Sequence, residues 1–225
     1  MASLLTSINS DEQVKSFPTL RETVRFQSYH TNKVVKRSFE KTSVALYNVG
    51  VIIRALAKRE EADQVEEMIQ EHLKKMAADL KTSIAQCEKL ALDAGITELP
   101  EYSAPQEYHV MITSPEMSIL LRLLKQMDVL MSYQDALWFH AIFSSRQHSD
   151  AGYEWQRRMI KMCNRIMAIE KRARAASYRR QTESGETVVD ESELMTSDAN
   201  DIAEDADDLL EQDLQAKPSP KTVAA

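Results

Sequence analysis

The clearest periodicity in the chain lies in residues 59–94, REEADQVEEMIQEHLKKMAADLKTSIAQCEKLALDA. Apolar side chains recur there at steps of three or four, with mostly Glu, Gln, Lys and Asp between them. The repeated positions are Val65, Ile69, Leu73, Met76, Leu80, Ile84, Cys87 and Ala91. This spacing predicts one long helix with a single apolar stripe, ended by Gly95. The stripe is typical of a protein core or a dimer seam and makes a mainly helical fold the first expectation.

The composition supports that fold class. Only four glycines and six prolines occur in 225 residues, which favours helices. No run approaches ~18 apolar residues, and residues 1–10 lack the features of a signal peptide, so neither a membrane span nor secretion is expected. Cys87 and Cys163 fit no paired-thiol pattern and predict two buried free thiols. We therefore expect a cytoplasmic protein.

The charge is unevenly distributed along the chain. From Gln181 onward, thirteen acidic residues face only two lysines, which gives about −11. Subtracting this from the total of −7 leaves about +4 for residues 1–180. We expect a flexible leader over residues 1–20, a single mainly helical domain over 21–180 and an acidic disordered tail over 181–225. Within the tail, residues 202–214 could form a transient amphipathic helix.

Two further segments predict strands. Residues 22–29 alternate polar and apolar side chains, and residues 107–113 place Tyr108, Val110 and Ile112 on one face. The two strands could pair within one sheet.

Helices are expected after each strand. Residues 30–32 would cap a short amphipathic helix over 33–39, and a break near Thr42-Ser43 would precede another helix over 44–56. After the second strand, Ser114 and Pro115 are typical of a helix start.

That helix would run to about Phe143 and be buried centrally. A turn over 144–152 and a closing helix over 153–178 would follow, packed through Trp155 and its apolar neighbours.

No enzyme site is recognisable in the sequence. It has no glycine-rich phosphate loop, no nucleophile elbow and no histidine pair at metal spacing, and Asp135 and His140 do not share a helical face. We expect no enzyme activity, no cofactor and no metal.

Two basic groupings remain. The first comprises Arg21, Arg25, Lys33, Lys36, Arg37 and Lys41. The second comprises Arg157, Arg158, Lys161, Arg165, Lys171, Arg172, Arg174, Arg179 and Arg180. Either one alone is compatible with a solvated face, but two of them upstream of an acidic tail favour nucleic-acid binding.

The first grouping suggests a specific mechanism. A strand with Thr23, Arg25 and Gln27 on its polar face could lie in the major groove of double-stranded DNA as half of a two-stranded ribbon and read bases. Phosphates would be contacted by Lys33, Lys36 and Arg37. The alternative is an edge strand with solvated polar residues.

Three segments carry a resemblance to a known family. They are LRETVRFQSYHT at residues 20–31, YHVMITSP at residues 108–115, and the region from Met127-Asp128 to Leu137-Trp138. Over about residues 20–178 the chain resembles the AcaB-type regulators encoded on bacterial conjugative plasmids and integrative elements. The resemblance implies a ribbon-helix-helix transcription factor, completed by dimerisation, that activates conjugative transfer genes.

Two strands compete for the DNA-reading position in such a fold. The strand from Thr23 has the more basic outward face, whereas the strand from Tyr108 presents His109, Met111 and Thr113. We favour the first. The overall hypothesis is a nucleoid-associated, sequence-specific DNA-binding activator acting as a homodimer or larger homo-oligomer. Its acidic tail would repel non-specific DNA or contact a partner such as RNA polymerase. The alternative is a non-enzymatic structural or adaptor protein of the conjugation machinery that assembles through helical interfaces.

Overall fold

The computed structural model describes residues 18–183. In chain order its elements are β1 (Leu20–Phe26), α1 (Tyr29–Val34), η1 (Val35–Phe39), α2 (Glu40–Asn48), η2 (Val49–Ile53), α3 (Arg54–Leu56), α4 (Arg59–Asp93), β2 (Gln106–Ile112), α5 (Pro115–Phe139) and α6 (Ser145–Glu183). The predicted leader and tail fall almost entirely outside the described residues.

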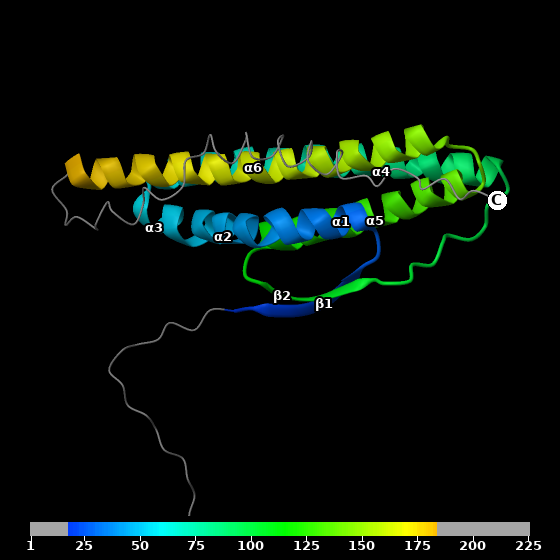
Figure 1. The fold of residues 1–225 in the computed structure, drawn as a ribbon. Helices are drawn as coiled ribbons and strands as arrows, with labels where there is room; N and C mark the ends of the chain where they lie inside the picture. Colours follow the sequence, from blue (N-terminus) through cyan, green and yellow to red (C-terminus); the bar gives the residue numbers. More distant parts are fainter. Residues whose placement is uncertain (1–17, 184–225) are drawn as a thin grey trace, which may run out of the picture.

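The described residues form three layers (Figure 1). Helices α4 and α6 make one layer, and α5 lies in the next layer beside the helical rod that runs from α1 to α3. A two-stranded antiparallel sheet of β1 and β2 covers the outer side of that second layer. The expected mainly helical fold with short strands is confirmed. Within residues 18–183, no helix is both long enough and apolar enough to cross a membrane.

Helix α4 agrees closely with its sequence pattern. Every position of the predicted stripe is buried except Ile84, which is partly buried, and the helix packs mainly against α5. It ends where Gly95 adopts a φ of 72°, a conformation that costs glycine little. The amide of Ile96 then donates to the carbonyl of Ala91 at 2.9 Å and satisfies one of the last helical acceptors. The stripe is therefore core within one chain.

The predicted break at Thr42-Ser43 is wrong. The backbone stays helical from Tyr29 to Leu56, with two π-helical turns, η1 and η2, inside the rod. The hydroxyls of Thr42 and Ser43 each donate at 2.8 Å to the carbonyl four residues earlier, so both residues are accommodated within a continuous helix. The strand β1 is therefore followed by one rod and not by two short helices.

The cap of that rod also differs from the prediction. Ser28, and not residues 30–32, is the N-cap, because its hydroxyl accepts from the amide of Thr31 at 3.2 Å. The second predicted cap is confirmed: Ser114 accepts from the amide of Met117, and Pro115 is the first residue of α5.

The expected turn over 144–152 is wrong after Ser144. Helix α6 begins at Ser145, and Gly152 lies inside it. A Cβ atom on Gly152 would lie 2.6 Å from Nε2 of His30, so any side chain there would force the imidazole ring to move. This glycine permits close approach of α6 to α1 and does not mark a turn.

The predicted free thiols are confirmed. Cys87 and Cys163 are both buried and unpaired with each other. Burial raises the pKa of both thiols, that of Cys163 to about 11. Both therefore remain protonated and unreactive at neutral pH.

Candidate nucleic-acid interface

The two predicted strands form one ribbon within a single chain. They pair antiparallel although about 80 residues separate them, with Thr23 opposite His109 and Arg25 opposite Glu107. Alternation turns Val24 and its buried neighbours toward the helices. The outer face consists of Arg21, Thr23, Arg25, Glu107, His109 and Met111, all exposed. The ribbon therefore presents one polar surface to solvent and one apolar surface to the core.

The predicted base-reading residues lie together on or beside that outer face. Thr23 and Arg25 belong to β1, and the Thr23 hydroxyl lies 3.1 Å from Nδ1 of His109 on β2. Gln27 follows the end of β1 and its side chain is exposed. Glu107 stands opposite Arg25 and partly offsets its charge. The outer face can thus offer guanidinium, amide and hydroxyl donors from adjacent positions.

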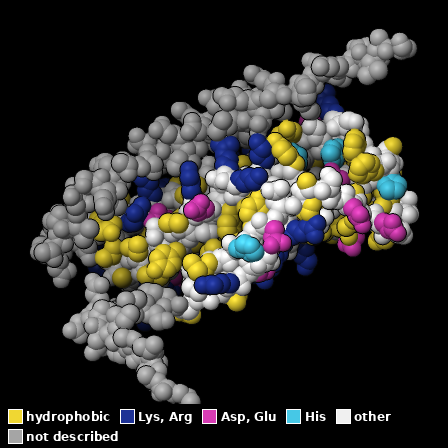
Figure 2. Space-filling view, turned by 60° about the horizontal axis from the view of Figure 1, so that its bottom comes forward, with side chains coloured by type: hydrophobic (Ala, Val, Ile, Leu, Met, Phe, Trp, Pro, Cys, Tyr) yellow, Lys and Arg dark blue, Asp and Glu magenta, His cyan; other side chains and the backbone are white. Residues whose placement is uncertain are grey.

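The predicted phosphate contacts come from the rod and not from the ribbon. Lys36 is exposed, whereas Lys33 and Arg37 are partly buried. The Lys33 ammonium lies 5.4 Å from the centre of the Tyr29 ring, in cation–π geometry. Figure 2 shows the ribbon side of the molecule with basic, acidic and apolar side chains intermixed. This face carries localised positive charges and is not uniformly basic.

A buried carboxylate fixes the junction between β1 and α1. Asp128 of α5 accepts two backbone hydrogen bonds of 2.9 Å, from the amides of Gln27 and Ser28. Asp128 is buried, with only 7% of its surface exposed. Charge-assisted bonds of this kind are stronger than neutral ones, and they satisfy donors that the start of a helix leaves unpaired. Asp128 therefore holds the ribbon in a defined position on the bundle.

A second polar contact ties both strands to the rod. The Asn32 amide donates to the carbonyls of Phe26, at 3.3 Å, and Ser28, at 2.9 Å. The hydroxyl of Tyr108 on β2 donates to the Asn32 side-chain oxygen at 2.9 Å. Neither Asp128 nor Asn32 was among the predicted site residues. Their signal in the sequence is a polar side chain at a position that helix periodicity assigns to the buried face.

The second basic grouping lies on α6, on the opposite side of the bundle from the ribbon (Figure 1). Several of its arginines bind other helices. Arg158 pairs with Asp79 of α4, and its guanidinium lies 4.2 Å from the Trp155 ring centre. Arg180 pairs with Glu61 of α4. The two basic groupings therefore do not merge into one surface.

Asp135 is half-buried, and its partners are His148 and Tyr102, not His140, the residue considered in the sequence analysis. Its carboxylate lies 2.5 Å from Nε2 of His148 on α6 and accepts a hydrogen bond from Tyr102. Burial, together with that carboxylate, raises the pKa of Tyr102. His140 instead lies with Nδ1 2.9 Å from the carbonyl of Ala136. The cluster joins α5, α6 and the segment between α4 and β2, which contains Tyr102. No group of three metal-binding side chains converges anywhere in residues 18–183.

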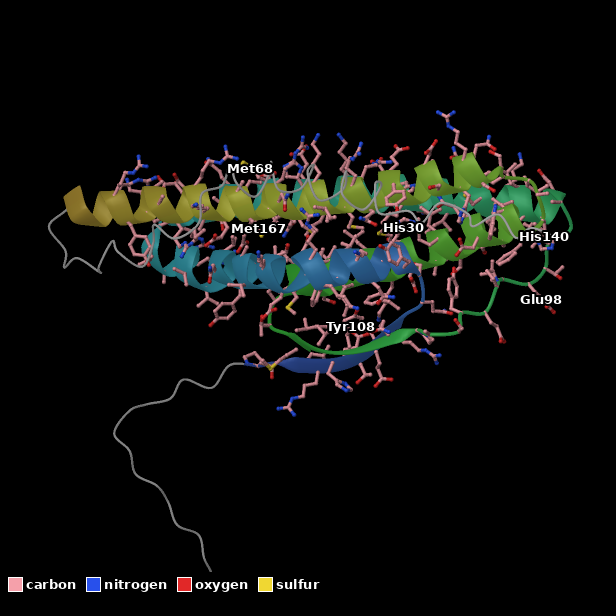
Figure 3. All side chains as sticks on the ribbon, in the orientation of Figure 1. His30, Met68, Glu98, Tyr108, His140 and Met167 are labelled. Atoms are coloured by element: carbon pink, nitrogen blue, oxygen red, sulfur yellow. The ribbon has the colours of Figure 1, made fainter. Side chains whose placement is uncertain are left out.

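A cavity of about 610 Å³ lies under one side of the ribbon, between β2, the rod and the start of α5. Its wall is mostly apolar and aromatic, formed by Phe26, Val35, Phe39, Tyr47, Tyr108 and Met117 with their neighbours. Tyr108 points from β2 toward the rod (Figure 3). Val35 and Phe39 are the first and last residues of η1, so the π-helical turn forms part of the wall.

Comparison with solved structures gives one clear similarity. The chain is similar to the crystal structure of selenomethionine-containing AcaB from uropathogenic E. coli, with 36% sequence identity and a TM-score of 0.76. The match covers 85% of this chain and 98% of that one. No family model matches the sequence, and no curated protein matches it. The resemblance inferred from residues 20–31 and 108–115 is confirmed.

Proposed function

The chain belongs to the AcaB family, and from that premise we propose that it is a sequence-specific DNA-binding transcriptional regulator that activates conjugative transfer genes. The observation that carries the proposal is the outer face of the ribbon, where Thr23 and Arg25 stand exposed and adjacent on an antiparallel pair of strands. The major groove of B-DNA admits a two-stranded ribbon of this kind.

The dimensions of the ribbon fit this function. Seven residues per strand give a length of about 23 Å, and the strands lie about 5 Å apart. Side chains on the outer face would then enter a groove about 12 Å wide. Arg25 would donate two hydrogen bonds to the acceptors of guanine, and Gln27 would pair with adenine. Thr23 would complete the contact with a hydroxyl.

The basic residues of the rod would contribute affinity without sequence information. Lys36 is exposed for a phosphate contact, and Lys33 and Arg37 lie on the same rod, in α1 and η1. Each phosphate contact releases a condensed counterion, so binding would weaken steeply with salt. No catalytic step is part of this function.

The regulator would act as a homodimer or larger homo-oligomer. Each chain completes its own ribbon, so two chains would present two ribbons to two half-sites. In a ribbon-helix-helix protein of the expected type, by contrast, each ribbon needs both chains. Activation would require a further contact with the transcription machinery, for which RNA polymerase is the expected partner.

A structural or adaptor function in the conjugation machinery is the second candidate. One observation favours it: Trp138, Phe139 and Ile142, at the corner between α5 and α6, are exposed by 38%, 67% and 45%. Exposed apolar residues that gather in one place are typical of protein contact surfaces. Such an adaptor would bind no particular DNA site.

Immunoprecipitation of DNA with the tagged full-length protein, from bacteria that carry a conjugative element, tests the choice. Sharp peaks upstream of transfer genes support the regulator, and they should disappear in Arg25→Ala. Arg165→Ala, an exposed arginine of α6, is the matched control and should keep the peaks. A flat immunoprecipitation profile from the soluble tagged protein without substitutions would favour the adaptor.

A further inference from the structure

The cavity beside the ribbon is open at an apolar mouth. Val44 of the rod is 55% exposed and Met111 of β2 is 54% exposed, and both line it. Its volume of about 610 Å³ lies within the range of sites that hold ligands or partner side chains. Within the described residues β2 pairs with β1 alone, so its other edge has no partner strand. Because the mouth and most of the wall of the cavity are apolar, an occupant must supply apolar groups.

We propose that the occupant is the acidic segment at residues 202–214 of the same chain. Its sequence, IAEDADDLLEQDL, has apolar side chains three or four residues apart, with one adjacent pair of leucines: Ile202, Ala206, Leu209, Leu210 and Leu214. This pattern gives a helix one apolar face, and an amphipathic helix laid into an apolar groove is a recurrent binding mode. The leucine pair would enter the cavity between the aromatic rings.

Charge favours this occupant. Residues 202–214 contain six acidic residues and no basic one. Lys36 and Lys41 are exposed on the rod beside the cavity-lining positions, and Arg25 is exposed on the ribbon. Glu40 lines the cavity and Glu107 offsets Arg25, which leaves two exposed lysines against one acidic residue. An acidic segment with one apolar face would therefore be attracted to this side of the molecule.

The connecting chain is long enough. Glu170 of α6 accepts a hydrogen bond of 3.0 Å from Asn48, the neighbour of the cavity residue Tyr47. Helix α6 continues from there to Glu183, a distance of about 20 Å. Residues 184–201 would span about 21–25 Å as a flexible chain and up to ~60 Å when extended. The segment can therefore return to the cavity.

Docking would place negative charge beside the ribbon. If the ribbon binds DNA as proposed above, the docked segment competes with phosphates and weakens binding to non-specific sequences more than to the operator. This consequence rests on the proposed function, whereas the docking itself does not.

The test uses the full-length chain without DNA. A nitroxide is attached at Gln212→Cys, on the polar side of the segment, while the two native cysteines are buried. The NMR signals of methionine methyl groups are then recorded, because the nitroxide broadens the signals of methyl groups that lie close to it. Met111 at the cavity and Met68 on α4 have similar exposure, 54% and 45%, and Met68 lies on the other side of the bundle (Figure 3). We expect several-fold stronger broadening of Met111 than of Met68.

An undocked tail predicts the opposite order. Arg180 near the end of α6 pairs with Glu61, only two helical turns from Met68, so an undocked tail would sweep past Met68 first. The double variant Leu209→Ser with Leu210→Ser should abolish the excess broadening of Met111. Val188→Ser with Val189→Ser, an equal change elsewhere in the tail, should preserve it. Stronger broadening of Met68, or the same pattern in both double variants, overturns the proposal.

Two further samples identify other occupants. If nitroxide-bearing chains broaden Met111 of unlabelled partners as strongly as their own, a second copy supplies the segment and the intramolecular proposal is wrong. The proposal is equally wrong if a nitroxide at Ser7→Cys, in the leader, broadens Met111 and that at position 212 does not. Adding operator-length duplex separates the two proposals. Absence of DNA binding by a chain whose Met111 was broadened before the duplex was added removes only the regulator. DNA binding by a chain whose Met111 was not broadened before that addition removes only the docking.

Discussion

The ribbon region and helix α6 both carry many basic residues, yet they use them differently. On α6, Arg158 and Arg180 bind acidic residues of α4, and Arg174 binds Glu170 of α6 itself. On the ribbon, Arg25 stands exposed on a rigid strand whose partner strand and junction are held by buried contacts. Positive charge in a sequence therefore does not identify an interface. The element that presents the charge decides whether it faces a partner or the protein itself.

Asp128→Ala should give the largest effect. The amides of Gln27 and Ser28 would lose their acceptor, at a cost of about 2–4 kcal/mol in unfolding free energy. The ribbon would lose its fixed position, and DNA binding would be lost with it. Urea unfolding followed by circular dichroism measures the first effect. Asp79→Ala, which removes the partner of Arg158 on the α6 side, should cost about 1 kcal/mol or less. Equal costs at the two positions would contradict the idea that the ribbon is held more strongly by Asp128 than α6 is held by its ion pairs.

Arg25→Ala should weaken binding to the operator by about 10- to 100-fold, because a bidentate contact with guanine contributes about 1–3 kcal/mol. Arg165→Ala should change the affinity less than twofold. Fluorescence anisotropy with a labelled operator at fixed salt measures both, and thermal melting controls for folding. If the α6 variant has the larger effect, the DNA surface lies on that helix.

Lys36→Ala should lower affinity for all sequences alike and reduce the slope of log K against log salt by about 1. Lys161→Ala, an exposed lysine of α6, should leave the slope unchanged. Titrations between ~50 and ~200 mM salt give both slopes. An unchanged slope for the Lys36 variant would remove the rod from the interface.

The smallest effect concerns His30, where the rod contacts α6. Its Nδ1 lies 2.8 Å from the Gln156 side chain, and burial lowers the pKa of His30 below 6.5. Because the folded pKa is the lower one, the stability that this residue contributes is present above pH 6.5 and is lost as the pH falls through the folded pKa. His30→Gln should reduce the loss of unfolding free energy on acidification. Chemical denaturation at several pH values tests this.

The sequence predicted well those elements that depend on short-range spacing. The stripe of α4, both strands and the Ser114-Pro115 cap follow from repeats of two, three or four residues, which local backbone geometry produces by itself. Thr42-Ser43 and Gly152 were misread because both are common in turns. Each is stabilised in a helix by a contact that spacing does not reveal, a hydroxyl bond to the preceding turn or a histidine ring from another element.

The candidate site was predicted only in its outer part. Alternation along β1 correctly gave the exposure of Thr23 and Arg25, but not the residues that hold them in place. Asp128 lies 100 residues from Ser28, and the His148 partner of Asp135 comes from a different helix. A single sequence does not pair positions so far apart, and so the supports of a site are harder to predict than its exposed surface.

The distance along the chain between the two strands has a consequence for synthesis. Because β1 and β2 are joined only after the whole of α4 has been made, closing the ribbon requires an ordered loop of about 80 residues. A ribosome-bound chain that has not yet emerged past Ile112 has only one strand of the ribbon and no complete outer face. If the ribbon binds DNA as proposed, a chain terminated before Ile112 would lack half of the binding surface and would not occupy an operator.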